Sequence, residues 1–456
     1  MTYKSASAIL TQPPNNRQNG RITVILLALI FAFLYYHFIV SHAPLGIKWR
    51  PFHEERVLNA LQNIHKNNIL LRFGFTSWMP AHHVSYQLNT PAPDLYLVTA
   101  LPYLAHILLQ SILTGYRPAL HGAIVDYCLI TYTGILITLL FYDKSNITTI
   151  IEKIYWSVAV FTIYLTSPWA YRMSLSMWHE VPFLAFYLTS IMLITWNKVR
   201  IGLIFSFLAA LINWEWAFLI VIFVSAYLLI CRLLNKTYTF TTTILPSPTN
   251  SGPMLLPYLA SLLMGVGICW FQALGAKLIG INHVGGSFLY RVGVDKLENI
   301  HHGGFLAALQ FLGGNRLSMC MPEQLGLEGL NSLNTKIAFF NCLSSIGGTF
   351  VLSSISIIGF ILLSRRRDTL ARLLAPLTWS FLVYMCLFQQ SFSVHLQGHS
   401  FVFTVIYSLG LASVIRLVSS YVSRHQVALS IPVSIPLIGA VIITSIRVSY
   451  YTGYNG

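Results

Sequence analysis

Charged side chains are scarce in this chain, because Asp, Glu, Lys and Arg together make up 9% of its 456 residues. Ordinary soluble domains carry about 25%. Acids are the rarer sign, with 13 Asp and Glu against 28 Lys and Arg. So little charge excludes a soluble globular protein, and it also excludes a disordered chain, which needs a polar composition.

Cysteine is also sparse, and the pattern of the six cysteines does not indicate a metal site. Most of them lie inside apolar runs, where cysteine behaves as a small buried hydrophobe. Cys320 is the exception, since it lies in a long polar loop that holds no second cysteine. The sequence therefore predicts no disulfide in that loop.

Apolar residues are abundant instead. They make up 55% of the chain, and the mean hydropathy is +0.65. Water would not keep so much apolar surface apart, so lipid must be the solvent for most of it. We expect an all-α, polytopic membrane helix bundle. The net charge of +15 then reports cytoplasmic loops, and we expect no nucleic-acid partner.

Eleven apolar runs are candidates for membrane crossings. A helix needs about 20 apolar residues to cross about 30 Å of hydrocarbon. The runs are 22–40, 119–142, 154–170, 181–196, 201–213, 214–233, 254–275, 337–363, 373–388, 401–415 and 431–446, of which 201–213 is short. A twelfth run, 95–113, is ambiguous because it contains Pro102 and His106.

Basic residues decide whether the ambiguous run crosses the membrane, because Lys and Arg near span ends stay on the cytoplasmic side. If 95–113 does not cross, most basic residues near span ends fall on one side. They are Lys4, Arg17, Arg21, Lys144, Lys153, Lys198, Arg200, Arg232, Lys236, Arg365, Arg366, Arg367, Arg372, Arg416 and Arg424. We therefore predict about eleven transmembrane helices, a cytoplasmic amino terminus and an exterior carboxyl terminus. The 95–113 segment becomes an exterior interface helix.

This topology divides the chain into four parts. Residues 1–21 form a cytoplasmic tail, and residues 22–233 form a first membrane module with the exterior loop 41–118. A cytoplasmic linker, 234–253, leads to a second membrane module, 254–456, with the exterior loop 277–336.

Carboxylates gather on the predicted exterior side. Glu54 and Glu55 stand in the first turn of a helix that begins near Phe52, where the helix dipole favours negative charge. These two glutamates either cap and solubilise the helix or take part in catalysis. Asp94 closes a Pro-rich segment and is explained by a capping role.

Glu180 is the second exterior candidate. It lies at the mouth of a span, where desolvation makes a carboxylate a better proton acceptor. The alternative is a membrane-edge carboxylate paired with Arg172 or His179. We interpret Glu215, between two tryptophans, as an acid in an aromatic interfacial belt. Asp126 falls inside a span and needs a partner in the bundle interior.

The order of these features resembles the GT-C membrane glycosyltransferases, the superfamily of protein O-mannosyltransferases and lipid A aminoarabinose transferases. In that family an acidic pair opens the first exterior loop, as His53-Glu54-Glu55-Arg56 does here. A Pro-containing interface segment follows, matched by Pro91-Ala92-Pro93-Asp94. A second loop of the form Ser-Pro, Arg and acid is matched by residues 167–168, Arg172 and Glu180.

The resemblance covers about the first half of the chain, and the sequence differs from the family pattern at some points. Glu replaces the commoner Asp, which leaves open whether Glu54 or Glu55 is the matched acid. A large carboxy-terminal soluble domain is missing, which argues against an oligosaccharyltransferase.

The resemblance implies an inverting transfer of a sugar from a polyprenyl-phosphate donor to a lipid, glycan or protein hydroxyl outside the cytoplasm. Glu55 would be the base, with Glu54 as its substitute, and Glu180 would orient the acceptor or stabilise the sugar. Substrate-binding candidates are Asp94, Arg172, His179, Arg291, Lys296, His301, His302, Arg316, His395 and His399.

We expect no cofactor, although His395 and His399 leave a divalent metal open. Compact loops favour a bacterial inner membrane. The competing interpretations are a transporter or flippase for a lipid or sugar, with charges lining a pathway, and a polysaccharide polymerase or ligase.

Overall fold

The computed structural model describes residues 14–42, 126–174, 180–233, 252–278, 312–313, 320, 333–365, 369–387, 400–423 and 426–454. Over these ranges the chain forms helices and no strand. The all-α prediction is therefore confirmed for this part of the chain.

Eleven of the described helices have 14 residues or more, and each overlaps one apolar run of the sequence. They are α1 (Pro14–Phe38), α5 (Tyr127–Lys144), α6 (Ile150–Thr166), α8 (Glu180–Thr195), α9 (Val199–Ile212), α10 (Trp214–Leu233), α12 (Gly252–Leu278), α15 (Leu333–Arg365), α16 (Thr369–Leu387), α19 (Phe403–Val422) and α20 (Val427–Tyr454).

Four of these helices are long and apolar enough to cross a membrane. The stretches that qualify are Gln18–His42, Lys336–Ser364, Phe403–Val422 and Leu429–Ser449. Several shorter apolar helices accompany them, among them α8 and α9. The chain is thus a multi-pass membrane protein by the length and composition of its helices, and the number eleven remains a prediction.

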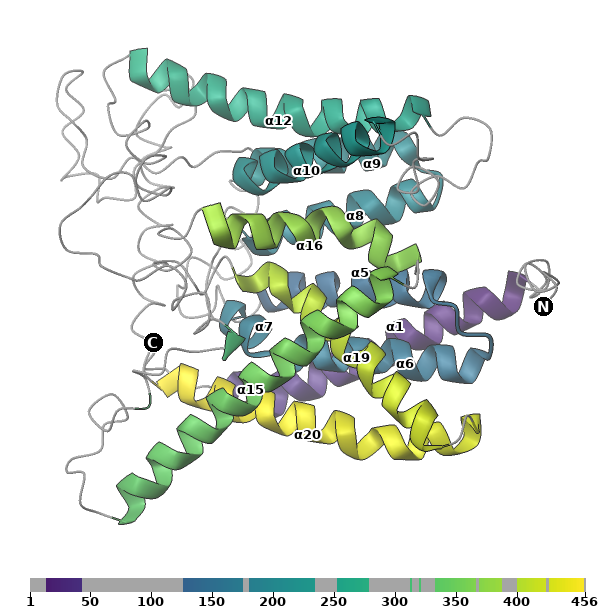
Figure 1. The fold of residues 1–456 in the computed structure, drawn as a ribbon, viewed down its shortest axis with the longest axis vertical. Helices are drawn as coiled ribbons and strands as arrows, with labels where there is room; N and C mark the ends of the chain where they lie inside the picture. Colours follow the sequence, from purple (N-terminus) through teal and green to yellow (C-terminus); the bar gives the residue numbers. More distant parts are fainter. Residues whose placement is uncertain are drawn as a thin grey trace.

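Successive long helices run in opposite directions, so that their termini gather at two ends of the bundle (Figure 1). At one end Arg21, near the start of α1, contacts Asp143, near the end of α5. At the other end Tyr384, late in α16, contacts Glu215 at the start of α10. We call these the Arg21 end and the Glu180 end, because α8 begins at Glu180 on the second side.

The segment after α6 departs from the sequence prediction. The run 154–170 was expected to form one span, but α6 ends at Thr166 and a separate short helix, α7 (Pro168–Met173), follows. Ser167 caps α7 by accepting a hydrogen bond from the Ala170 N–H at 3.3 Å. Pro168 ends α6 because it disfavours helical backbone in the residue before it, and it suits the first position of α7.

The turn between α9 and α10 is very tight. Asn213 alone separates Ile212, the last residue of α9, from Trp214, the first of α10. Its N–H donates to the carbonyl of Ala209 at 3.0 Å, and its Oδ1 accepts from the Trp216 N–H at 3.3 Å. Asn213 thus ends one helix and caps the next, as expected for an Asn N-cap.

Glycine allows α15 and α19 to cross closely. A Cβ on Gly410 would collide with the backbone of Ser356, and one on Gly359 would collide with the backbone of Gly410. Small residues at a crossing let helix backbones approach each other inside a membrane. The contact between α15 and α19 therefore depends on two residues without side chains.

A disulfide joins Cys320 to Cys342, with 5.5 Å between their Cα atoms. Cys320 has no partner within its own loop, as predicted, but the interpretation of Cys342 as a simple buried hydrophobe was wrong. The partner lies in the first third of α15, inside an apolar run that was counted as a span. The partner of Cys320 therefore comes from a helix and not from the polar loop.

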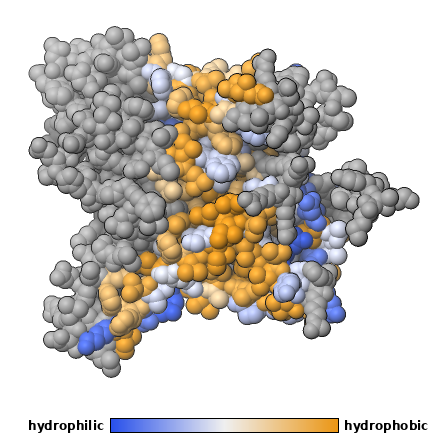
Figure 2. Space-filling model, viewed as in Figure 1, coloured by the Kyte–Doolittle hydropathy of each residue, from blue (hydrophilic) through white to orange (hydrophobic). Residues whose placement is uncertain are grey.

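The outer surface of the bundle is apolar between its two ends. Figure 2 shows an orange band across the middle of this face, with blue residues near the start of α1 and the start of α15. The exposed apolar side chains on α15, α19 and α20 include Phe340, Val351, Ile358, Leu417, Ile435 and Ile443. Such a band fits contact with lipid tails.

Candidate functional site

Two of the predicted site residues lie in the described part of the chain, Glu180 and Arg172. The others lie outside the described residues, so their placement stays a prediction. These are Glu54, Glu55, Asp94, His179, Arg291, Lys296, His301, His302, Arg316, His395 and His399. Within the described ranges, no three His, Cys, Asp or Glu side chains form a group that could hold a metal ion.

Glu180 is the first residue of α8, and its side chain is fully buried, with 0% exposed. Pro182 lies in the same first turn, where a proline is tolerated because that N–H has no partner within the helix. The N-terminal end of a helix favours a negative charge. A carboxylate at this place is therefore inside the protein and held at the Glu180 end.

Arg172 stands in the last turn of α7 and is partly exposed. The preceding Trp169 fixes this helix against α19, with ring centroids 4.9 Å from Phe403 and 5.1 Å from Tyr407. Burial raises the pKa of the Tyr171 phenol to about 12, so that side chain stays neutral at physiological pH. Arg172 is the charged group that α7 presents at this end.

Glu215 is a second buried glutamate, with 4% exposed. It lies in the first turn of α10, and the Tyr384 hydroxyl of α16 donates to its Oε2 at 3.0 Å. Glu215 lies at the junction of two apolar runs, as the sequence indicates, but its carboxylate is buried inside the bundle and does not face outward. Its helix start turns the side chain toward α16, away from lipid.

Aromatic rings connect the two glutamates. Phe183 follows Glu180 by three residues and so lies on the same side of α8. Its ring stacks on Trp216 at 6.4 Å, and Trp216 stacks on Tyr384 at 4.6 Å. We call this set of buried rings the aromatic cluster, and its members are Trp169, Phe183, Trp216, Phe381, Tyr384, Phe403 and Tyr407.

Asp126 is the third buried acid at this end, directly before α5 and with 0% exposed. Burying a carboxylate is costly unless polar groups compensate it, so ionisable residues inside membrane helices usually serve function. The Glu180 end thus carries three buried acids, Asp126, Glu180 and Glu215, among the described residues.

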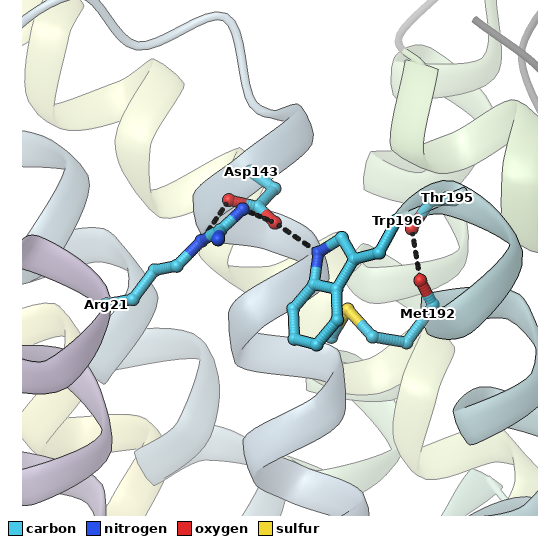
Figure 3. Close-up of polar contacts among 5 residues, drawn as sticks. All are labelled: Arg21, Asp143, Met192, Thr195 and Trp196. Carbon is cyan, nitrogen blue, oxygen red and sulfur yellow. Dashed lines mark hydrogen bonds and ion pairs between the residues drawn. The ribbon is translucent and has the colours of Figure 1, made fainter. Parts of the chain in front are cut away.

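The Arg21 end is built differently (Figure 3). Arg21 donates two hydrogen bonds to Asp143, from Nε at 2.9 Å and from Nη2 at 2.7 Å. Trp196 donates to the same carboxylate at 3.1 Å, and the guanidinium lies 5.3 Å from the Trp196 ring centroid. Opposite charges, a hydrogen bond and a cation–π contact therefore join α1, α5 and the end of α8.

Sequence reasoning missed the importance of Glu215 and Asn213. A usable signal was present, because Asn213-Trp214-Glu215-Trp216 stands where two apolar runs meet without a loop. Polar residues at such a junction must either cap the new helix or point into the interior. Tyr384 could not have been found in this way, since it lies 169 residues away.

No protein-family model matches this chain, and no curated protein sequence matches it. The chemistry of the site therefore rests on its own residues and their placement.

Proposed function

We propose that this chain is a membrane glycosyltransferase with a GT-C-like fold. It would transfer a sugar from a polyprenyl-phosphate donor to an acceptor hydroxyl on the non-cytoplasmic face, with inversion. The observation that carries this proposal is the fully buried carboxylate of Glu180 in the first turn of α8, at the end of the bundle opposite Arg21.

Two features support the orientation. Lys144, Lys153, Lys198 and Arg200 lie with Arg21 at the starts and ends of helices on one side. Positive charge concentrates on the cytoplasmic side of membrane proteins, so the Arg21 end is the cytoplasmic one, and the chain crosses about eleven times. A bacterial inner membrane is the proposed location.

The disulfide supports the same orientation independently. Cys342 lies near the start of α15, at the Glu180 end, where Asn341 contacts Arg447 of α20. Disulfides persist in oxidising compartments and are rare in the cytosol. The Glu180 end is therefore assigned to the exterior.

The chemistry needs a base more than an acid. A lipid phosphate departs without strong protonation, whereas the acceptor hydroxyl must lose its proton as it attacks the sugar carbon. In the proposal Glu55, or Glu54 in its place, takes that proton. Glu180 orients the acceptor or stabilises the positive charge that develops on the sugar. Arg172 binds the donor phosphate, for which a guanidinium is well suited.

A transporter or flippase for a lipid-linked sugar is the second candidate. The burial of Asp126, Glu180 and Glu215 favours it, since intramembrane acids often line transport pathways. The two candidates differ in whether a glycosidic bond is broken.

The test uses the full chain in lipid nanodiscs with a panel of radiolabelled polyprenyl-phosphate hexoses and a membrane extract as acceptor. The measurement is the release of polyprenyl phosphate together with labelled product. Glu180→Gln should lower turnover by about 10²-fold to 10³-fold, the range for losing one group that stabilises charge in the transition state. The variant should keep its elution profile and melting temperature.

Glu152→Gln is the matched control. Glu152 lies in the first turn of α6 at the Arg21 end and accepts a hydrogen bond from Thr149, so its turnover should equal that of the wild type. Full turnover in Glu180→Gln would remove Glu180 from the site. Movement of intact donors across a vesicle membrane, dependent on Glu180 and without bond cleavage, would establish the transporter instead.

A further inference from the structure

Polar groups concentrate around the first turn of α10 in a way that capping and packing do not explain. We call Asn213, Glu215, Trp216, Ser380 and Tyr384 the α10 polar cluster. The proposed mechanism gives none of the five a role, and all five are buried. Tyr384 and Ser380 are one turn apart on α16, and so lie on the same side of that helix.

Three members of this cluster hold buried polar atoms that have no hydrogen-bond partner in the described structure. They are Asn213 Nδ2, Trp216 Nε1 and Ser380 Oγ. Asn213 is 3% exposed, and its other amide atom, Oδ1, is already engaged by the Trp216 N–H. Its NH₂ group is thus held against the same helix turn that carries Glu215. Buried donors without acceptors are costly and call for an explanation.

The chemistry of the cluster selects a class of ligand. An amide NH₂ and an indole N–H offer donors, a serine hydroxyl offers both roles, and Glu215 offers an acceptor. A phosphate would need positive charge, and the cluster supplies none. A metal ion would meet mostly N–H and O–H donors. A neutral ring with several hydroxyl groups satisfies donors and acceptor together.

The place of the cluster connects it to Glu180. Trp216 stacks on Phe183, three residues after Glu180 in α8. Tyr384 both stacks on Trp216 at 4.6 Å and donates to Glu215. A ligand in the cluster therefore adjoins the helix start that carries Glu180.

We propose that the α10 polar cluster is the subsite for the hexose ring of the lipid-linked donor. Glu215 and Asn213 hydrogen-bond the sugar hydroxyls, and Tyr384 positions Glu215. This assignment rests on the proposed function, and it adds which residues recognise the sugar as distinct from the lipid phosphate.

The test compares three probes: farnesyl phosphate, farnesyl-phosphoryl-glucose and farnesyl-phosphoryl-mannose. Each is titrated by calorimetry into the full chain in nanodiscs. The wild type should bind a sugar-bearing probe at least about tenfold tighter than farnesyl phosphate, a difference of about 1.4 kcal/mol. Glu215→Gln and Asn213→Ala should bring this ratio close to one while the affinity for farnesyl phosphate stays unchanged.

Three further variants separate the possible outcomes. Tyr384→Phe keeps the ring but removes the hydroxyl, so it should lower the ratio by a smaller factor. Glu180→Gln should keep the ratio while losing transfer, and Glu152→Gln should keep both. A merely structural role for Glu215 would weaken the binding of all probes alike and would overturn the assignment.

The subsite and the proposed function fail in different ways. A wild-type ratio of one, with sugar transfer still measured, overturns the subsite alone. A ratio that survives in well-folded Glu215→Gln and Asn213→Ala does the same. Absence of binding by the wild type to any of the three probes overturns both.

Discussion

The two ends of the bundle handle charge in opposite ways. At the Arg21 end, Asp143 is 3% exposed but meets a guanidinium and an indole N–H. At the Glu180 end, Glu215 is buried and accepts a hydrogen bond from the Tyr384 hydroxyl. The first arrangement pairs the acid with a cation and joins three segments of chain, whereas the second places an acid against a tyrosine hydroxyl beside stacked aromatic rings.

Under the proposed function, the acids at the Glu180 end act on substrate, whereas the pair of Arg21 and Asp143 only holds helices together. A bidentate pair between arginine and carboxylate fixes geometry and consumes the acceptor capacity of the carboxylate. Substitutions of Arg21 or Asp143 should therefore change stability without changing turnover. Substitutions of the buried acids at the Glu180 end should change turnover.

The largest stability effect is expected from the disulfide at the Glu180 end. Cys320 and Cys342 are separated by 22 residues, and closing a loop of that size stabilises a protein by about 3 kcal/mol. Cys342→Ser should lower the unfolding free energy by about that amount, measured by thermal unfolding in nanodiscs. Reductant should then have no further effect on this variant.

Cys128→Ser is the control for that experiment, because Cys128 is a free thiol. A membrane-impermeant reductant added to intact cells should free the two bridged thiols for labelling. Thiols already free at positions 320 and 342 in protein trapped directly from cells would contradict the assignment of this end to an oxidising compartment.

The next effect is expected at the Arg21 end. Asp143→Asn removes the charge that faces Arg21 and should destabilise the bundle by about 2 kcal/mol, the scale of hydrogen bonds to charged groups. A double-mutant cycle with Arg21→Met measures how much of this comes from the pair. Turnover per folded molecule should match that of the wild type. A tenfold loss of turnover would contradict the claim that the Arg21 end serves stability alone.

The smallest effect is expected from the cap of α7. Ser167→Ala removes the acceptor for the Ala170 N–H and should cost about 1 kcal/mol. Because α7 carries Arg172, the KM for the donor should rise severalfold while kcat changes little. Ser354→Ala is the control, since its hydroxyl bonds only its own helix backbone at an exposed site. Equal KM values in the two variants would show that α7 does not contribute to donor binding.

Much of the helical arrangement could be predicted from the sequence because lipid imposes long apolar runs. The predicted span 214–233 has the same bounds as α10, and 181–196 differs from α8 by one residue at each end. The prediction failed at 154–170, where Ser167 and Pro168 interrupt a run that stays apolar. A hydropathy average over the run hardly changes at this dipeptide, but the dipeptide ends one helix and starts another.

The site could be predicted only where one residue carried the signal. Glu180 stands out as an acid beside an apolar run, and the structure buries it. The role of Glu215 and the bridge from Cys320 depend on partners that folding brings near. Tyr384 lies 169 residues from Glu215, and Cys342 lies in a helix whose composition indicates only a span. No local pattern contains such pairs.

The one-residue turn at Asn213 also limits how this protein can change. An inserted residue would rotate α10 by about 100° relative to α9, because each residue of an α-helix advances by that angle. Glu215 and Trp216 would then turn away from Tyr384 and Phe183, their present partners. Substitutions along α9 can accumulate one at a time, but the length of chain between α9 and α10 is fixed.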